Sequence, residues 1–112
     1  MNCYLDYQLM YLILDGINYS DENEDIVTFL VDADPYIWEG EGSADPAIYK
    51  DFKEKYYSWN DHEDFSYNFV LNYLKTIDYY KGLFDAINSI TKERYIECCN
   101  DILNNHKNLL KL

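Results

Sequence analysis

The chain has 112 residues and a formal net charge of -12, from 21 acidic and 9 basic residues. Apolar residues make up 48% of it and aromatic residues 18%, which excludes intrinsic disorder, because disordered acidic chains are poor in aromatic residues. The negative charge argues against direct binding to nucleic acid or to anionic lipid. A chain of this length buries enough surface to fold alone, so we expect a single domain over residues 1–112.

The charge is concentrated in the N-terminal part of the sequence. Residues 1–49 contain 11 carboxylates and no lysine or arginine, whereas residues 50–112 contain 10 acids and 9 bases. A surface of one sign attracts macromolecules of the opposite sign. The asymmetry therefore predicts a basic protein partner.

The first residues lack the pattern of an export signal. No basic residue precedes the apolar run 9–14, and this run is too short to span a bilayer. Cys3, Cys98 and Cys99 are odd in number, and the adjacent pair has a spacing that rarely forms a disulfide. We expect a cytoplasmic protein whose cysteines are reduced and packed in helix faces.

Hydrophobic spacing predicts helices in the N-terminal part of the chain. Residues 3–16 place apolar residues on one helical face, and Gly16 has the position of a C-cap. Ser20 or Asp21 can cap a following helix. The run 26–31 suits a strand by its β-branched residues and a short buried helix by its preceding cap. We prefer the helix, because no other segment offers a convincing strand partner and a lone strand leaves its backbone unpaired.

Start and stop signals predict the later helices. Asp45 followed by Pro46 is a strong helix start, Lys81-Gly82 is an expected break, and the last helix opens near Thr91. Apolar residues at helical spacing predict helices over 46–59, 65–77, 83–90 and 91–110. The expected fold is all-α, an irregular bundle of about five or six helices.

An acidic loop is expected near residues 32–45, where proline and glycines interrupt the helical spacing. We expect its tip to be mobile. Tyr36 and Trp38 lie among its carboxylates, and Trp38 either folds back to close the core or stands as an aromatic anchor. An anchor surrounded by charge is the composition of an interface for a basic protein. The candidate partner-binding residues are Asp32, Asp34, Tyr36, Trp38, Glu39, Glu41 and Asp45.

Signals for a metal site or for catalysis are weak. The acidic loop does not fit a calcium-binding loop, because Tyr36 or Glu39 falls where such a loop requires another residue type. Residues 61–64 mix carboxylates with a histidine, but the only other histidine is His106. There is no glycine-rich phosphate loop and no nucleophile motif. We expect no metal, no cofactor and no catalytic residue.

The segment Asp34-Pro35-Tyr36-Ile37-Trp38, followed by Ser43 to Tyr49 and by Phe52, resembles the immunity proteins of bacterial toxin systems, in particular those of contact-dependent growth inhibition. The stretch covers about a sixth of the chain. The resemblance implies a cytosolic protein that binds one toxin domain tightly and blocks it. Many such toxins are nucleases, and an acidic inhibitor can place carboxylates where the phosphates would lie.

The leading hypothesis is therefore an immunity protein that neutralises a basic toxin domain, with a nuclease expected. A second hypothesis, also a binding protein, is a phage-type nucleic-acid mimic that inhibits a host enzyme. A third, from another class, is a small metal-dependent enzyme built around Asp61, His62, Glu63 and His106. Gene order separates the first two, since an immunity gene lies beside its toxin gene.

Overall fold

Six α-helices and two short 3-10 helices form the regular structure of the computed structural model, which describes residues 2–20, 23–77 and 80–111. These residues include no β-strand, so the expected all-α class is confirmed. The helices are α1 (Cys3–Ser20), α2 (Glu24–Ala33), α3 (Pro46–Ser58), α4 (Tyr67–Thr76), α5 (Leu83–Asn88) and α6 (Lys92–Asn105), with the 3-10 helices η1 (Asp64–Ser66) and η2 (Lys107–Leu109).

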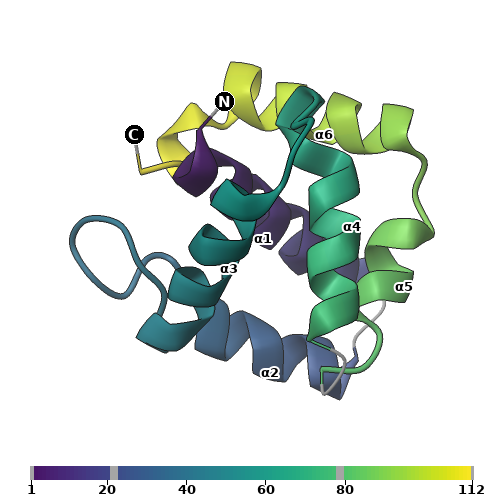
Figure 1. Ribbon diagram of the computed structural model, residues 1–112. Coiled ribbons are helices and arrows are strands. Elements are labelled where there is room, and N and C mark those ends of the chain that lie inside the picture. The colour runs from purple at the N-terminus through teal and green to yellow at the C-terminus, as the bar shows by residue number, and fades with distance from the viewer. Residues whose placement is uncertain (1, 21–22, 78–79, 112) are drawn as a thin grey trace.

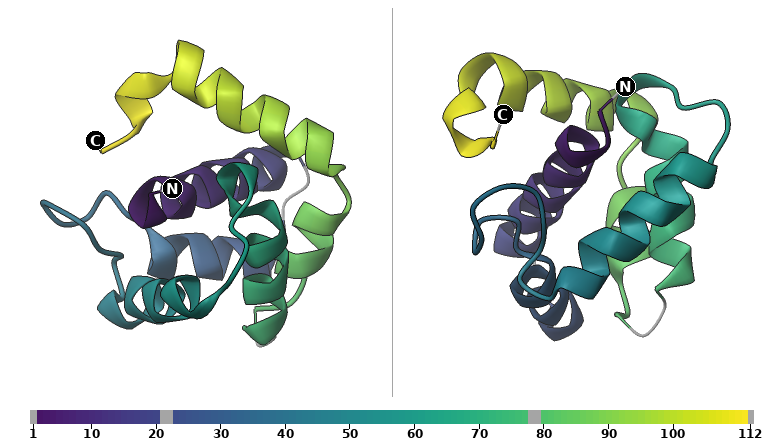
Figure 2. Two further views of the ribbon diagram at one scale, coloured as in Figure 1. Left: turned by 45° about the horizontal axis from the view of Figure 1, so that its top comes forward. Right: turned by 60° about the vertical axis from the view of Figure 1, so that its left-hand side comes forward.

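Helix α1 is the centre of the arrangement. It packs against α2, α3, α5 and α6, and in Figure 1 it passes behind α3 and α4. The described Cα atoms have a radius of gyration of 12.9 Å and extents of 30 × 30 × 29 Å, so the helices form one globule. Figure 2 shows that the segment after α6 approaches the loop between α2 and α3, which extends away from the helices.

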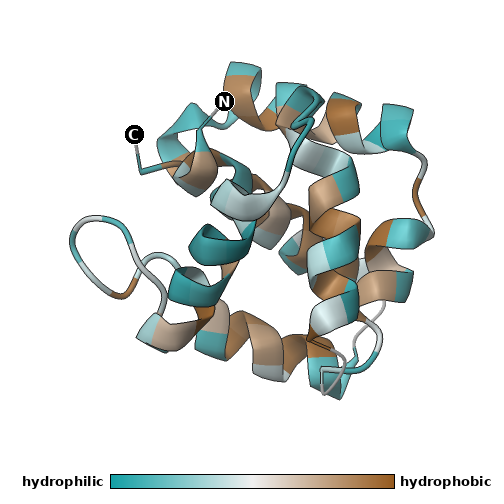
Figure 3. Cartoon of the chain, in the orientation of Figure 1, coloured by the Kyte–Doolittle hydropathy of each residue, from teal (hydrophilic) through white to brown (hydrophobic). Residues whose placement is uncertain are grey.

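The core is rich in aromatic side chains. Figure 3 shows brown, apolar residues on inward helix faces and teal, polar residues on outward ones. Phe52 lies at the centre of an aromatic cluster, where the rings of Tyr7, Phe69 and Tyr73 meet it edge-on at centroid distances of 5.0, 5.1 and 4.9 Å. Edge-to-face pairs of this kind contribute roughly 0.5–1.5 kcal/mol each beyond the area they bury.

Tyrosines of α1 also satisfy carbonyl groups at the end of α2. The last carbonyls of a helix have no partner within it. The hydroxyl of Tyr7 donates to the carbonyl of Ala33 at 2.6 Å, and that of Tyr11 donates to the carbonyl of Leu30 at 2.9 Å. The polar tips of these buried side chains thus hold α1 and α2 together and place the start of the following loop.

Several helix starts agree with the sequence patterns. Residues 26–31 are helical, as preferred. The Asp45 side chain accepts from the amide of Ala47 at 3.1 Å, with Pro46 as the first residue of α3. The side chain of Thr91 caps α6 by accepting from the amide of Arg94, and Gly82, with φ +92°, precedes α5 at the expected break.

The end of α1 was predicted wrongly, and so was the cap of α2. Helix α1 continues past Gly16 to Ser20, because Gly16 keeps helical geometry and the next residue, Ile17, still packs against the core. Ser20 is thus no cap for α2. The cap is Asn23, whose side chain accepts from the amides of Asp25 and Ile26, while Asp21 lies outside the described residues.

At the other end of the chain, α6 stops at Asn105, short of the expected Leu110. The backbone leaves helical geometry at His106, with φ -134° and ψ 31°. The chain then turns through η2 and buries Leu110, which is 9% exposed. This turn brings the end of the chain back toward α1.

Candidate functional site

The acidic loop, residues 34–44, connects α2 to α3 and is closed at its base by backbone hydrogen bonds. The amide of Ala44 donates to the carbonyl of Asp34, and that of Asp45 donates to the carbonyl of Asp32, each at 2.8 Å. The loop spans fewer residues than the expected range 32–45, because Asp32 lies within α2 and Asp45 is the cap of α3. The closed base fixes where the loop leaves the globule.

Three consecutive large side chains, Tyr36, Ile37 and Trp38, form an exposed tip on this loop. They are 41%, 57% and 54% exposed. The alternative in which Trp38 closes the core is therefore wrong. Its indole nitrogen donates to the carbonyl of Ser43 at 2.9 Å, which fixes the ring while leaving about half of it in solvent.

Tyr36 is held at the inner side of the exposed tip. Its ring meets that of Tyr11 edge-on at a centroid distance of 6.1 Å. Partial burial, together with the carboxylate of Asp34, raises the pKa of Tyr36 to about 12. The phenol therefore stays a neutral hydrogen-bond donor at physiological pH.

Most of the predicted carboxylates have hydrogen-bonding roles within the chain. Asp34 accepts from the amide of Tyr36 at 2.7 Å, and Glu41 accepts from the hydroxyl of Tyr49 at 3.1 Å. Asp32 accepts from the hydroxyl of Tyr80 at 2.9 Å. With the cap formed by Asp45, four of the five predicted carboxylates thus shape the loop and its base.

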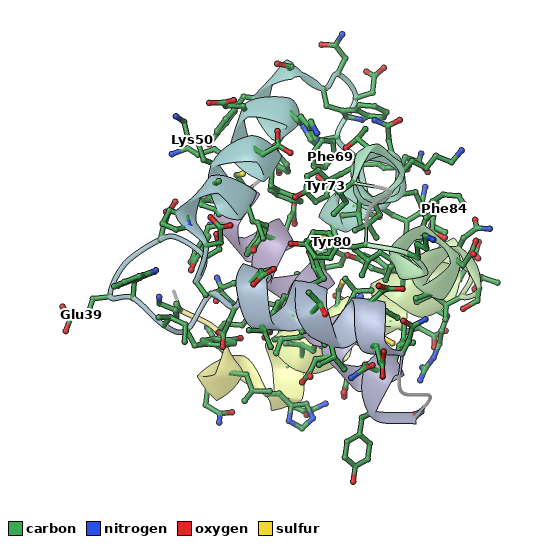
Figure 4. All side chains as sticks on the ribbon, turned by 90° about the horizontal axis from the view of Figure 1, so that it is seen from below. Glu39, Lys50, Phe69, Tyr73, Tyr80 and Phe84 are labelled. Carbon is green, nitrogen blue, oxygen red and sulfur yellow. The ribbon has the colours of Figure 1, made fainter. Side chains whose placement is uncertain are left out.

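Glu39 is the exception among the predicted carboxylates. It is exposed, makes no hydrogen bond with its side chain to another described residue, and points away from the globule in Figure 4. The structure thus brings the predicted residues together around the exposed tip, but gives them two roles. Glu39 is free to meet a partner, while the others also hold the loop.

The surface is less uniformly negative than the sequence suggested. Asp6, one of the 11 carboxylates of residues 1–49, is 5% exposed and does not reach the surface. The ammonium of Lys111, from the charge-balanced part of the sequence, lies against the inner side of the acidic loop. The other described carboxylates of residues 1–49 are exposed or half-buried.

Asp6 belongs to a buried polar cluster that the sequence reasoning missed. One of its carboxylate oxygens accepts from the hydroxyls of Tyr56 at 2.7 Å and Ser66 at 2.8 Å. Burial raises the pKa of Asp6, and these two hydrogen bonds oppose the shift. An aspartate between apolar residues of the helix face at 3–14 was the available signal.

The histidine proposed as a metal ligand is engaged in the same cluster. His62 Nδ1 lies 2.8 Å from the Ser66 hydroxyl, and Nε2 lies 2.7 Å from the carbonyl of Tyr56, so Nε2 must donate. His106 lies beside Asp101 instead, at 3.6 Å. Within the described ranges, no three histidine, cysteine or acidic side chains are grouped to hold a metal ion.

The backbone around this cluster is strained. Asp61, Phe65 and Ser66 have φ values of 60°, 55° and 54°, in the left-handed region that non-glycine residues rarely adopt. Ser66 is 1% exposed and lies between the carboxylate and the imidazole. This order differs from a catalytic triad, in which the histidine lies between the other two, and the buried hydroxyl cannot meet a substrate.

Comparison of the chain with protein-family models, curated proteins and solved structures found no significant match. In the part of the chain that the structure describes, no helix has the length and apolar character needed to cross a membrane. The functional assignment therefore depends on the geometry of the chain's own residues.

Proposed function

We propose that this chain is an acidic inhibitor protein of the immunity-protein kind, which binds a cognate basic toxin domain and blocks its active-site cleft. The observation that carries the proposal is the exposed tip, Tyr36 to Trp38, presented on an acidic loop that hydrogen bonds hold in place. Contiguous exposed apolar patches, especially those rimmed by polar residues, mark protein interaction sites.

The composition of this surface matches the known energetics of tight interfaces. Aromatic residues dominate the few contacts that carry most of the binding energy, and charge at the rim steers association and selects the partner. Here, the indole of Trp38 supplies the anchor, and Glu39 supplies rim charge. A loop already fixed by hydrogen bonds also loses less conformational entropy on binding than a mobile one.

A nuclease is the expected activity of the toxin. Nuclease clefts are basic because they bind the phosphate backbone. Carboxylates at the loop can occupy such a cleft in place of phosphates, and the net charge of -12 favours the encounter. The resemblance of residues 34–52 to immunity proteins supports the same choice.

Co-expression with the product of the adjacent gene tests this proposal. We expect the neighbouring product to contain a basic domain that arrests growth and degrades cellular DNA or RNA, and we expect this chain to restore growth. The variant Glu39→Lys should weaken the protection, whereas Glu54→Lys, at an exposed glutamate on α3, should preserve it.

Two results would overturn the proposal. One is a toxic neighbour whose effect this chain does not relieve. The other is protection that survives Glu39→Lys combined with Trp38→Ala but is lost with Glu54→Lys. A partner encoded elsewhere, in the host of a phage, would instead support the nucleic-acid mimic.

A further inference from the structure

Lys111 makes an unusual set of contacts with the acidic loop. Its ammonium nitrogen lies 2.8 Å from the carbonyl oxygen of Pro35, 2.5 Å from that of Trp38 and 2.6 Å from that of Gly40. An ammonium group has three protons to donate, and these three carbonyls use all of them. One side chain therefore fixes backbone groups at three points of the loop.

The backbone of Lys111 is held in place by hydrogen bonds to a buried side chain of α1. Its amide donates to the side-chain carbonyl of Gln8 at 2.7 Å, and the side-chain amide of Gln8 donates to the carbonyl of Lys111 at 3.1 Å. Gln8 is 1% exposed on α1, and the preceding residue, Leu110, is buried. The end of the described chain is thus anchored on the central helix before its side chain reaches the loop.

Tyr4 supports the same side of the loop. Its hydroxyl lies 3.1 Å from the carbonyl oxygen of Pro35 and 3.0 Å from that of Gly42. The ammonium of Lys111 lies 5.9 Å from the centre of its ring. Two side chains from outside the loop therefore hold its inward carbonyls, while the exposed tip faces solvent.

We propose that Lys111 is the positioning residue of the partner-binding loop, so that α1, the acidic loop and the segment after α6 act as one binding unit. The positioning itself stands on the contacts above, and its consequence for binding rests on the proposed function. Without the ammonium, the three carbonyls lose their shared donor and the loop samples other conformations. Only a fraction of the molecules would then present the exposed tip correctly, and the apparent affinity falls by that fraction.

Amide hydrogen exchange measured by NMR tests the positioning without any partner. We expect Lys111→Met to accelerate exchange of the amides of Ala44 and Asp45, which close the loop, at least tenfold, while core amides of α3 keep their wild-type rates. Lys107→Met removes the same charge from an exposed lysine on η2 and should leave the loop amides unchanged. Lys111→Arg keeps the positive charge but spreads its donors over a planar guanidinium, so it should restore only part of the protection. Unchanged exchange of the loop amides in Lys111→Met would overturn the proposal.

Binding to the neighbouring toxin domain tests the consequence. Lys111→Met should lower affinity at least tenfold, although the lost positive charge by itself favours a basic partner, and Lys107→Met should not. If Lys111→Met loosens the loop and Trp38→Ala leaves binding intact, the proposed interface is wrong while the positioning role stands. If Trp38→Ala abolishes binding and Lys111→Met loosens the loop without changing affinity, the positioning role in binding is overturned.

Discussion

The hydroxyl of Tyr56 donates a 2.7 Å hydrogen bond to the carboxylate of Asp6, and this places an ionisable group in the core. Ser66 donates to the same oxygen at 2.8 Å. Removing a carboxylate from water disfavours its charged form, and here burial outweighs the two hydrogen bonds, so the pKa of Asp6 is raised. The stability of the protein should therefore depend on the ionisation of Asp6.

The sign of this dependence follows from proton linkage. Because the pKa of Asp6 is higher in the folded state, its protonation contributes stability that is complete below the unfolded pKa, about 3.9, and is lost as pH rises through the folded pKa. Asp6→Asn keeps an acceptor oxygen and cannot ionise. We expect the free energy of unfolding of this variant to rise relative to that of wild type as pH increases from about 4. The difference should become constant above the folded-state pKa.

Urea denaturation of both proteins from about pH 4 to 8 measures this difference. Asp15→Asn, at an exposed carboxylate on the same helix, removes an equal charge and serves as the control. A difference between Asp6→Asn and wild type that does not vary with pH would contradict the prediction.

Asp45→Ala should destabilise the fold, because it removes the side chain that caps α3. Loss of such a cap costs about 0.5–2 kcal/mol in the free energy of unfolding. Glu39→Ala, at an exposed side chain, should change it by less than about 0.5 kcal/mol. Equal effects of the two changes in urea denaturation would show that the Asp45 cap adds nothing.

This contrast separates two candidate partner-binding residues, Asp45, which also caps a helix, and Glu39, which does not. Local signals such as Asp45-Pro46 and Thr91 were readable, because helix caps depend on neighbouring residues alone. The contacts of Lys111 were not, since they join residues 71 to 76 positions apart in the sequence. Burial of Asp6 likewise depends on Tyr56 and on Ser66, which only the tertiary fold brings to it.

The end of α1 near Gly16 could likewise not be predicted from the local sequence. Its neighbours suggested a C-cap, but α1 continues because tertiary packing of the next turn overrides the local preference. A Cβ atom added at Gly16 meets nothing within 4 Å. Gly16→Ala should therefore raise the free energy of unfolding by about 0.5–1 kcal/mol, since alanine has the higher helix propensity.

Thermal or urea denaturation measures the effect of Gly16→Ala, and Gly82→Ala is the contrasting variant. Gly82 has φ +92°, and a Cβ atom there would lie 2.9 Å from the side-chain nitrogen of Asn23, the cap of α2. We expect this variant to be destabilised. A Gly16→Ala variant less stable than wild type would show that the glycine is needed within the helix.

Charge should control how fast the proposed complex forms. Exposed charges are screened over about 8 Å at physiological ionic strength, so added salt weakens steering between this chain and a basic domain. We expect the association rate to fall steeply with salt while the dissociation rate changes little, as measured by stopped-flow mixing. An association rate that is the same at low and high salt would remove the electrostatic part of the proposal.

The most direct test of the proposed function is the affinity of Trp38→Ala for the basic toxin domain proposed as the partner, measured together with the melting temperature of the variant. Trp38 is 54% exposed, so its removal should leave melting nearly unchanged. As the interface anchor, it should cost about 2 kcal/mol or more in binding, roughly a 30-fold loss of affinity. Tyr19→Ala, at an aromatic residue that is 93% exposed at the end of α1, should bind like wild type. Wild-type affinity of Trp38→Ala would contradict the proposal that the exposed tip is the binding site.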